Sequence, residues 1–340
     1  MRKFLVTGGA GFIGSAFVRL LLDHFSDARV TNLDLLTYAG NPDNLGGLDQ
    51  QRHDFIHGDI VDSGVVARAM DGCEVVINFA AESHVDRSID NCADFLRTNI
   101  MGTQVLLDVA RHQGVQRFVQ VSTDEVMGSL PDDSAECFTE SSGFAPNSPY
   151  AASKAAAEHL VRAAHHTFGL DTVVTRCGNN YGPRQFPEKF LPLLICNALN
   201  NEAIPIYGDG RNVRDWIYVE DHCRGILAAL EKGRSGGVYN LGARNERRNL
   251  EVAESVLTAL GKPHSLLNFV VDRPGHDRRY AIDPSLAETE LDWQPRETWE
   301  SGLEKTIAWY QTNSHWIERV RNHEYREYYR KQYGAQVQTI

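Results

Sequence analysis

Three glycines close to the start of the chain restrict its fold more than any other feature of the sequence. Gly8, Gly11 and Gly14 follow a short strand-like run at Lys3–Val6 and directly precede a helical pattern at Phe12–Leu22. In a strand-to-helix turn, glycines at this spacing permit a tight bend, a close approach of the backbone to a pyrophosphate and close packing of the helix on the sheet. The trio could also be a plain turn, but its position between a strand and a helix favours a dinucleotide-binding turn.

Strand-like and helical patterns alternate through the first half of the chain. The sequence predicts further strands at Val30–Leu33, Asp54–His57, Glu74–Phe79, Phe118–Val121 and Thr172–Thr175. It predicts further helices at Ser63–Met70, Cys92–His112 and Tyr150–Phe168. This alternation indicates an α/β fold, in which a doubly wound parallel (Rossmann) sheet is covered by helices on both faces.

The pattern changes after about Arg176, where loops rich in Asn, Gly and Pro separate shorter helical segments. These segments lie near Pro187–Leu199, Val219–Leu230 and Leu250–Leu260. We therefore expect a dinucleotide-binding domain at residues 1–175 and a smaller C-terminal substrate-binding lobe formed mainly by residues 176–340. We expect residues 213–245 to pack back onto the first domain.

Charge and cysteine content argue against several classes of function. The chain has 340 residues with 45 acidic and 34 basic side chains, a net charge of −11, so no overall basic field would attract nucleic acid. The six cysteines form no C-x-x-C pair, which suits reduced thiols in the cytoplasm. No stretch reaches the roughly 18 apolar residues of a membrane span, and no His/Cys cluster or H-x-E-x-H motif suggests a metal.

Acidic residues follow the second and third predicted strands. Asp34 can accept hydrogen bonds from both ribose hydroxyls of NAD and would repel the 2′-phosphate of NADP, although it could instead cap a turn. Asp59 could contact the adenine amino group or simply close a strand-end turn. The residues that we expect to bind NAD are Gly8, Gly11, Phe12, Ile13, Gly14, Asp34, Asp59, Ile60, Ala80, Ala81, Tyr150 and Lys154.

Tyr150 and Lys154 are four residues apart in a predicted helix and therefore share one face. Lys154 can hold the nicotinamide ribose and lower the pKa of Tyr150, which would make the phenolate available as a base. A Y-x-x-x-K pair alone is common in surface helices. Downstream of a dinucleotide-binding turn and of a strand that ends in Ser and Thr, it becomes a strong indication of such a base.

A run of polar residues, Ser122–Glu125, ends the fifth predicted strand, at the edge where doubly wound sheets place their chemistry. Thr123 can donate to a sugar hydroxyl beside Tyr150. Asp124 and Glu125 can act as an acid and a base if their surroundings separate their pKa values. An exposed acidic turn is the alternative interpretation.

With these motifs the sequence resembles the extended short-chain dehydrogenase/reductases, and among them the dTDP-glucose 4,6-dehydratases, from Lys3 to about Tyr333. The segments that carry the resemblance are Leu36–Asn41, Ala81–Ser88, Ser122–Val126, Asn179–Pro183, Phe186–Lys189, Val213–Asp221 and Asp272–Tyr280. Three positions depart from the family pattern: Met127 replaces a tyrosine, and Arg176 and Gly178 replace Asn and Ser. Met127 removes a hydroxyl near the expected site.

The resemblance implies a lyase that removes water from a nucleotide-activated hexose, using NAD that is reduced and reoxidised within one turnover. In that scheme the catalytic residues are Thr123, Asp124, Glu125, Tyr150 and Lys154. The substrate-binding residues implied are Ser83, His84, Thr123, Asn180, Lys189, Tyr207, Arg214, Asn249 and Arg273. His84 could equally be a structural histidine.

Several alternatives remain open at this stage. A uracil nucleotide could replace the thymine nucleotide, giving a UDP-sugar 4,6-dehydratase. UDP-sugar epimerases and decarboxylases share the fold and the Tyr/Lys pair, and an NAD-binding regulatory protein without turnover is a further class. The resemblance also suggests a homodimer, in which apolar stripes on Cys92–His112 and Tyr150–Phe168 pair with those of a second subunit.

Overall fold

A computed structural model describes residues 2–132, 134–321 and 330 of the chain. Its main element is a seven-stranded sheet in the order β10-β6-β5-β4-β1-β2-β3, in which every neighbouring pair is parallel. The strands are β1 (Lys3–Thr7), β2 (Arg29–Asp34), β3 (His53–His57), β4 (Val75–Asn78), β5 (Arg117–Thr123), β6 (Thr172–Cys177) and β10 (Gly237–Leu241). The predicted doubly wound α/β fold is confirmed.

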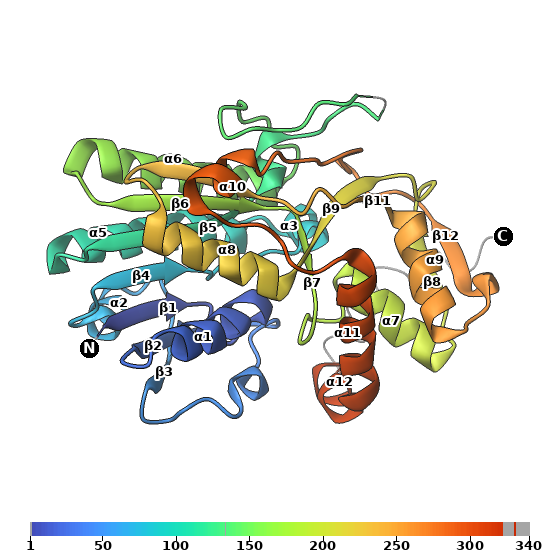
Figure 1. Ribbon diagram of the computed structural model, residues 1–340, viewed down its shortest axis with the longest axis horizontal. Coiled ribbons are helices and arrows are strands. Elements are labelled where there is room, and N and C mark those ends of the chain that lie inside the picture. Colours follow the sequence, from blue (N-terminus) through green and yellow to red (C-terminus); the bar gives the residue numbers. More distant parts are fainter. Residues whose placement is uncertain (1, 133, 322–329, 331–340) are drawn as a thin grey trace.

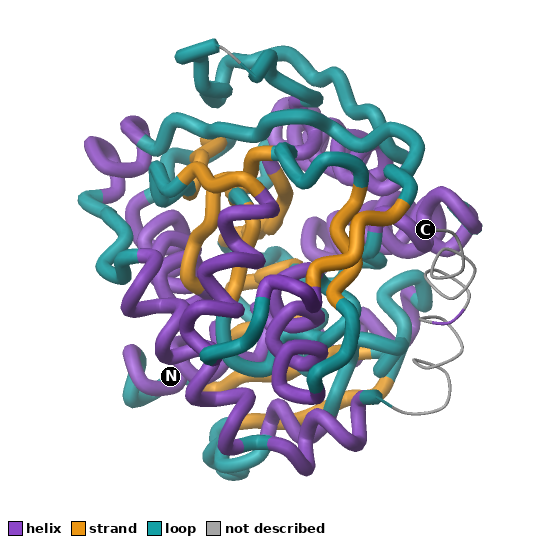
Figure 2. The backbone as a smooth tube through the Cα atoms, turned by 90° about the vertical axis from the view of Figure 1, so that its right-hand side faces the viewer, coloured by secondary structure: helices purple, strands orange, loops and turns teal. Residues whose placement is uncertain are grey.

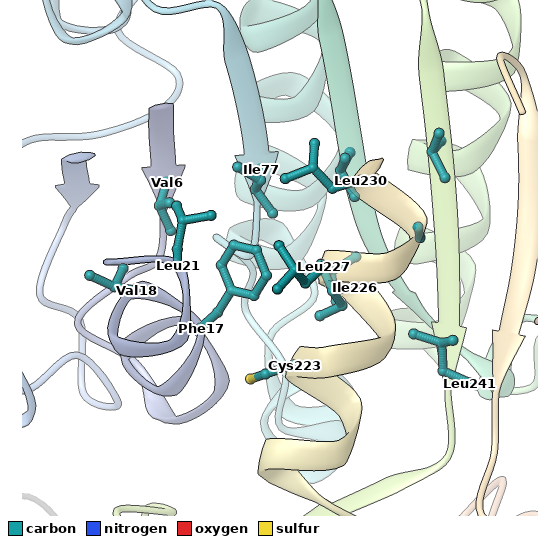
Figure 3. Packing of buried hydrophobic residues seen from close by; sticks show 14 of the residues in the cluster. Val6, Phe17, Val18, Leu21, Ile77, Cys223, Ile226, Leu227, Leu230 and Leu241 are labelled. Carbon is teal, nitrogen blue, oxygen red and sulfur yellow. The ribbon is translucent and has the colours of Figure 1, made fainter. Parts of the chain in front are cut away.

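Helices cover both faces of this sheet (Figures 1 and 2). On one face α1 (Phe12–His24), α8 (Val219–Lys232) and α10 (Ser285–Leu291) pack into one apolar core, which Figure 3 shows around Phe17, Ile77 and Leu227. On the other face α2 (Ser63–Met70), α5 (Thr103–Gln113) and α6 (Pro149–Phe168) enclose a second core. Because the central strands are buried on both faces, β1 and β4 contain the unbroken apolar runs Phe4–Val6 and Val75–Ile77, whereas β5 also buries the polar side chain of Gln120.

Chain segments from the C-terminal half contribute to this layered part. Strand β10 pairs with β6 at one edge of the main sheet, and α8 packs against α1. Strand β9 (Val213–Tyr218) instead pairs with β7 (Asn179–Tyr181) and β11 (Glu246–Arg248) in a separate three-stranded sheet. The division of the chain at residue 175 stays a prediction. The predicted end of the second lobe at residue 340 and the end of the family resemblance at Tyr333 lie outside the described residues.

A third core lies beside the main sheet, at the right in Figure 1. It is built on β8 (Ile204–Tyr207), β12 (Leu267–Val270), α7 (Phe190–Asn200), α9 (Asn249–Leu260), α11 (Trp299–Thr312) and α12 (Ser314–Val320). Buried aromatic rings of Tyr181, Trp216 and Trp299 contact one another at its centre. The sequence predicted α7 and α9 but missed α11, α12 and the strands of this core.

The predicted single helix at Cys92–His112 is interrupted. The structure has α4 (Ala93–Phe95), a π-helical segment at Leu96–Gly102 and then α5. Within the π segment, the Asn99 side chain accepts from the Glu82 amide at 2.9 Å and donates to the Ser153 hydroxyl at 2.8 Å. Tertiary hydrogen bonds, which apolar periodicity does not encode, therefore accompany the change of helical pitch.

Candidate active site

A cavity of about 320 Å³ opens at the carboxyl ends of the parallel strands, which is where doubly wound sheets bind their ligands. All of the residues predicted to bind NAD and all of those predicted to be catalytic line this cavity. So do Ser83, Asn180 and Lys189 from the predicted substrate set. Residues from 8 to 216 of the chain therefore meet at one site.

The glycine turn forms one wall of the cavity, and two of its positions exclude any side chain. Gly8 has φ +69°, and a Cβ there would lie 2.6 Å from the Ala80 amide nitrogen. A Cβ at Gly14 would overlap the carbonyl oxygen of Gly8. Helix α1 begins after Gly11 without a side-chain cap, so no side chain accepts from its first amides. The turn brings these amide donors to the surface of the cavity, as a pyrophosphate site requires.

Asp34 ends β2 and lines the same cavity. Its Oδ2 accepts from the Ala10 amide at 2.9 Å, and its Oδ1 accepts from the Leu36 amide at 2.8 Å. Burial raises the pKa of Asp34, while these two amide bonds act in the opposite direction. The carboxylate is thus held by the glycine turn itself, in a position where it can accept further hydrogen bonds from a ligand.

Asp59 also lines the cavity, but both of its carboxylate oxygens already have partners. Oδ1 accepts from the Val61 amide at 3.0 Å, and Oδ2 accepts from Arg97 Nη1 at 2.6 Å. These two contacts fit the strand-end turn that was the alternative interpretation of Asp59. The contact with the adenine amino group stays a prediction.

Tyr150 and Lys154 lie on the inward face of α6, which begins at Pro149 after the cap Ser148. Both are buried, and Lys154 Nζ donates to the Val121 carbonyl at 2.7 Å. Burial lowers the pKa of Lys154 to about 8. The pKa of Tyr150 is raised well above its usual value by burial and by the Glu125 and Asp124 carboxylates. The surroundings thus do not produce the expected lowering of the Tyr150 pKa by Lys154.

The acidic pair follows β5 in a short 3₁₀ turn at Asp124–Met127. Thr123 caps this turn by accepting from the Glu125 amide at 3.2 Å, and its hydroxyl lies 3.2 Å from Asp124 Oδ1. The other oxygen of Asp124 is buried without a hydrogen-bond partner among the described residues. An acidic turn on the surface is thereby excluded for Asp124.

The two carboxyl groups lie in different electrostatic surroundings. Burial and the neighbouring Glu125 raise the pKa of Asp124 well above its usual value, against the opposing effect of Arg214. Burial also raises the pKa of Glu125, but Arg273, Arg214 and Lys189 all lower it. Asp124 is therefore the group that better retains a proton, and Glu125 is the one that better carries charge.

The predicted substrate residues divide into three groups. Asn180 and Lys189 line the cavity, with Lys189 Nζ donating to the Ser83 carbonyl at 2.6 Å. Arg214 and Arg273 lie outside the lining, but both lower the pKa of Glu125, as described above. Tyr207, His84 and Asn249 do not line the cavity. His84 is buried at the start of α3 (Val85–Asp90), 3.4 Å from the Glu188 carbonyl.

Asp86 is a functional candidate that the sequence analysis did not select. Its Oδ2 accepts from the Tyr207 hydroxyl at 3.0 Å, and its Oδ1 accepts from Arg273 Nη1 at 2.8 Å. It therefore fixes two of the predicted substrate residues at once. The signal available in the sequence was its place in the Ala81–Ser88 segment, next to His84.

The three departures from the family pattern all have local partners. Arg176 forms a buried ion pair with Glu158, with Nη2 at 2.8 Å from Oε2, and its Nη1 lies 3.6 Å from the sulfur of Met127. Met127 is buried in a small apolar cluster and does not line the cavity. At Gly178 a Cβ would come 2.6 Å from the Asp215 carbonyl, which leaves no room for a serine.

The chain is similar to known enzymes over almost its whole length. Residues 5–306 match the family model described as GDP-mannose 4,6 dehydratase. The chain is 46% identical to a dTDP-glucose 4,6-dehydratase of Shigella flexneri, with 97% of this chain and 99% of that relative covered.

Two solved structures show the same architecture. The dTDP-glucose 4,6-dehydratase DesIV from Streptomyces venezuelae, solved with NAD and TYD bound, superimposes with a TM-score of 0.91 at 49% identity, covering 94% of this chain and 99% of that one. A Thermus thermophilus UDP-glucose 4-epimerase in complex with NAD gives a TM-score of 0.85 at 31% identity, covering 92% and 99%.

Proposed function

Because the chain belongs to the GDP-mannose 4,6 dehydratase family, and within it to the dTDP-glucose 4,6-dehydratases, we propose that it converts dTDP-glucose to dTDP-4-keto-6-deoxyglucose with loss of water. The observation that carries this proposal is the position of Asp124 and Glu125. They lie beside Tyr150 at the end of β5, and their surroundings favour a proton on the first and a charge on the second. Removal of water across two carbons needs one acid and one base of this kind.

The cavity suits NAD as the resident cofactor. The glycine turn leaves space for a pyrophosphate where a Cβ at Gly8 or Gly14 would collide with backbone, and the Asp34 carboxylate is held where it can accept from ribose hydroxyls. Gly11, Phe12, Ile13, Ile60, Ala80 and Ala81 complete this part of the wall. Bound NAD supplies the acceptor, and later the donor, of the hydride that leaves C4 and returns to C6 of the sugar.

The protein's own side chains move the protons. Tyr150 takes the proton of the C4 hydroxyl, with Thr123 beside it and the charged Lys154 offsetting the negative charge that develops. A protonated Asp124 helps here, because Tyr150 then faces one carboxylate instead of two. Once C4 is a ketone, its neighbour C5 becomes acidic.

The elimination then uses the acidic pair. Glu125 takes the C5 proton while Asp124 gives its proton to the departing C6 hydroxyl, which leaves as water. The raised pKa of Asp124 favours its protonated form, and the three cations around Glu125 favour its charged form before each turnover. Glu125 returns its proton to C5 at the end. The cycle closes when Tyr150 releases the proton that it took from the C4 hydroxyl and Asp124 regains one, so the turnover has no net uptake or release of protons.

An assay of product and cofactor tests the proposal. The purified protein is incubated with dTDP-glucose, with UDP-glucose as the comparison, and the sugars are identified by NMR. We expect a 4-keto-6-deoxy sugar from dTDP-glucose with no net accumulation of NADH. A 4-epimer without loss of water, or a stoichiometric requirement for fresh NAD, would contradict it.

The assembly and location form a further part of the proposal. The apolar side chains of Leu96, Met101 and Phe168 are exposed along the π segment and α6, and a shallow groove between α5 and α6 is lined by Leu107 and Leu160 among others. A second copy of the same face would bury them in a four-helix homodimer.

All six cysteines are free thiols, which supports a cytoplasmic location. Within the described residues, no helix is both long and apolar enough to cross a membrane.

A further inference from the structure

One arginine outside the cavity lining connects three of the cavity's walls. Arg87, on α3, donates from Nε to Glu188 Oε2 at 3.0 Å, and its Nη2 lies 3.0 Å from the same oxygen. Its guanidinium also lies over the ring of Tyr38, 4.0 Å from the ring centre. Arg87 thus joins the segment after β2, the segment after β4 and the segment before α7.

Each of these segments contributes residues to the lining of the cavity. Thr37, Ala39 and Gly40 flank Tyr38, and Glu82 and Ser83 precede α3. Glu188 itself lines the cavity, together with its neighbours Phe186 and Lys189. Separation of any two of these segments would therefore open the wall around a bound dinucleotide.

Further contacts connect the same three segments. The Tyr38 ring meets the Phe186 ring edge-on, with centroids 5.7 Å apart. Lys189 Nζ donates to the Ser83 carbonyl at 2.6 Å, and His84 Nε2 lies 3.4 Å from the Glu188 carbonyl. The segment at 186–189 is therefore bound to both of the other two. Arg87 and Tyr38 each contact both of the segments to which they do not belong.

The environment makes the Arg87 contact strong and specific. The Glu188 side chain is 1% exposed and that of Arg87 is 29% exposed, so the pair is largely shielded from water. A planar guanidinium can place two donors on one carboxylate while stacking on an aromatic ring, and an ammonium group cannot do both. Loss of Arg87 would leave the buried carboxylate of Glu188 without this partner.

We propose that Arg87 is a positioning residue that holds these three segments closed over NAD and so determines how long the cofactor stays bound. The inference rests on the proposed function, in which one NAD is reduced and reoxidised in place during every turnover. A cofactor that is regenerated at the site has no reason to leave, and its early loss stops the cycle. The clamp formed by Tyr38, Arg87 and Glu188 supplies the retention that this chemistry requires.

The experiment measures the lifetime of bound NAD in Arg87→Lys and in Tyr38→Leu, which unlinks the segment after β2 while leaving the Arg87–Glu188 pair intact. Holoenzyme is diluted into an enzyme that destroys free NAD, and the remaining bound NAD is quantified over time. The matched control is Arg117→Lys. Arg117 makes a similar double contact to Asp171, at 2.8 and 3.0 Å, but this pair lies at the amino ends of β5 and β6, away from the cavity at their carboxyl ends.

We expect both clamp variants to lose NAD at least about tenfold faster than the parent, and Arg117→Lys to lose it at the parental rate. Saturating NAD in the assay should restore the turnover number of the clamp variants, which a distorted catalytic site would not allow. Parental NAD lifetimes in both clamp variants, or a deficit that added NAD does not correct, would overturn the inference. A parent protein that carries no NAD would instead refute the proposed function itself.

Discussion

The Lys154 ammonium group donates to the backbone carbonyl of Val121 at 2.7 Å, and this bond ties α6 to β5 two residues before Thr123. Helix α6 and strand β5 carry the two halves of the proposed catalytic set, Tyr150 with Lys154 and Thr123 with the acidic pair. The contact therefore fixes the distance between them. It also places a charged group in a buried position, which has a measurable effect on stability.

Lys154→Met should change how stability depends on pH. Burial lowers the pKa of Lys154 from 10.5 to about 8, so between pH 8 and pH 10.5 the unfolded chain binds a proton that the folded chain does not. The parent's free energy of unfolding should therefore rise relative to that of Lys154→Met across this window, by about 3 kcal/mol in total. Urea denaturation of both proteins at pH 7, 8, 9 and 10 measures this, and a constant difference would contradict it.

Gly8→Ala should remove bound NAD, whereas Gly261→Ala should not. Both glycines have positive φ, +69° and +63°, so both substitutions strain the backbone by about 1 kcal/mol. Only at Gly8 does the new Cβ meet backbone atoms of the cofactor wall; at Gly261 nothing lies within 4 Å. The NAD content of the two purified variants checks this. Equal content in both would show that the turn does not hold the cofactor.

Glu158→Gln should destabilise the fold strongly. Glu158 and Arg176 are each 4% exposed and form a buried ion pair, so removal of one charge leaves the other without compensation, at a cost of about 3–5 kcal/mol. The double variant Glu158→Gln/Arg176→Met should lose less than the single variant, because no unpaired charge remains. Urea unfolding of both variants tests this expectation, and a double variant that loses more stability than the single variant would contradict it.

Ala163→Glu should separate the proposed dimer into monomers. Ala163 is exposed and lines the groove between α5 and α6, so a new carboxylate there would be buried against its own copy in the homodimer. Sedimentation at micromolar concentration should give the mass of a dimer for the parent and of a monomer for the variant. A monomeric parent would contradict the proposed assembly.

The parts of the site that were predictable from the sequence are those that lie next to a strand end. Gly8, Asp34 and Thr123 each follow a recognisable strand, and parallel strands bring their carboxyl ends to one edge. Likewise, the spacing of Tyr150 and Lys154 is a local property of one helix. For these residues, the local sequence pattern and the topology of a parallel sheet together suffice to place them at the cavity.

Contacts between distant segments were not predictable in this way. Asp86 meets Tyr207 and Arg273 across 121 and 187 residues, and no periodicity links them. The π segment at 96–102 accompanies hydrogen bonds of Asn99 to Glu82 and Ser153, which a helical pattern does not reveal. The raised pKa of Tyr150 was not predictable either, because it depends on the burial of Tyr150 and on the acidic pair beside it.

In the proposed mechanism, Glu125 and Asp124 perform the elimination after Tyr150 has enabled the oxidation. Glu125→Gln keeps the shape of the side chain but removes the base. We therefore expect it to form the 4-ketone, seen as NADH absorbance on rapid mixing with dTDP-glucose, while product release falls about 10²–10⁴-fold and deuterium exchange at C5 is lost. Tyr150→Phe, the control, should show no NADH signal at all.

The most direct single measurement is the rate at which Glu125→Gln releases 4-keto-6-deoxy sugar under these conditions. Our account predicts a rapid NADH signal that persists while product appears at least about a hundredfold more slowly than from the parent. Release of that product at the parental rate would contradict the assignment of Glu125 as the C5 base.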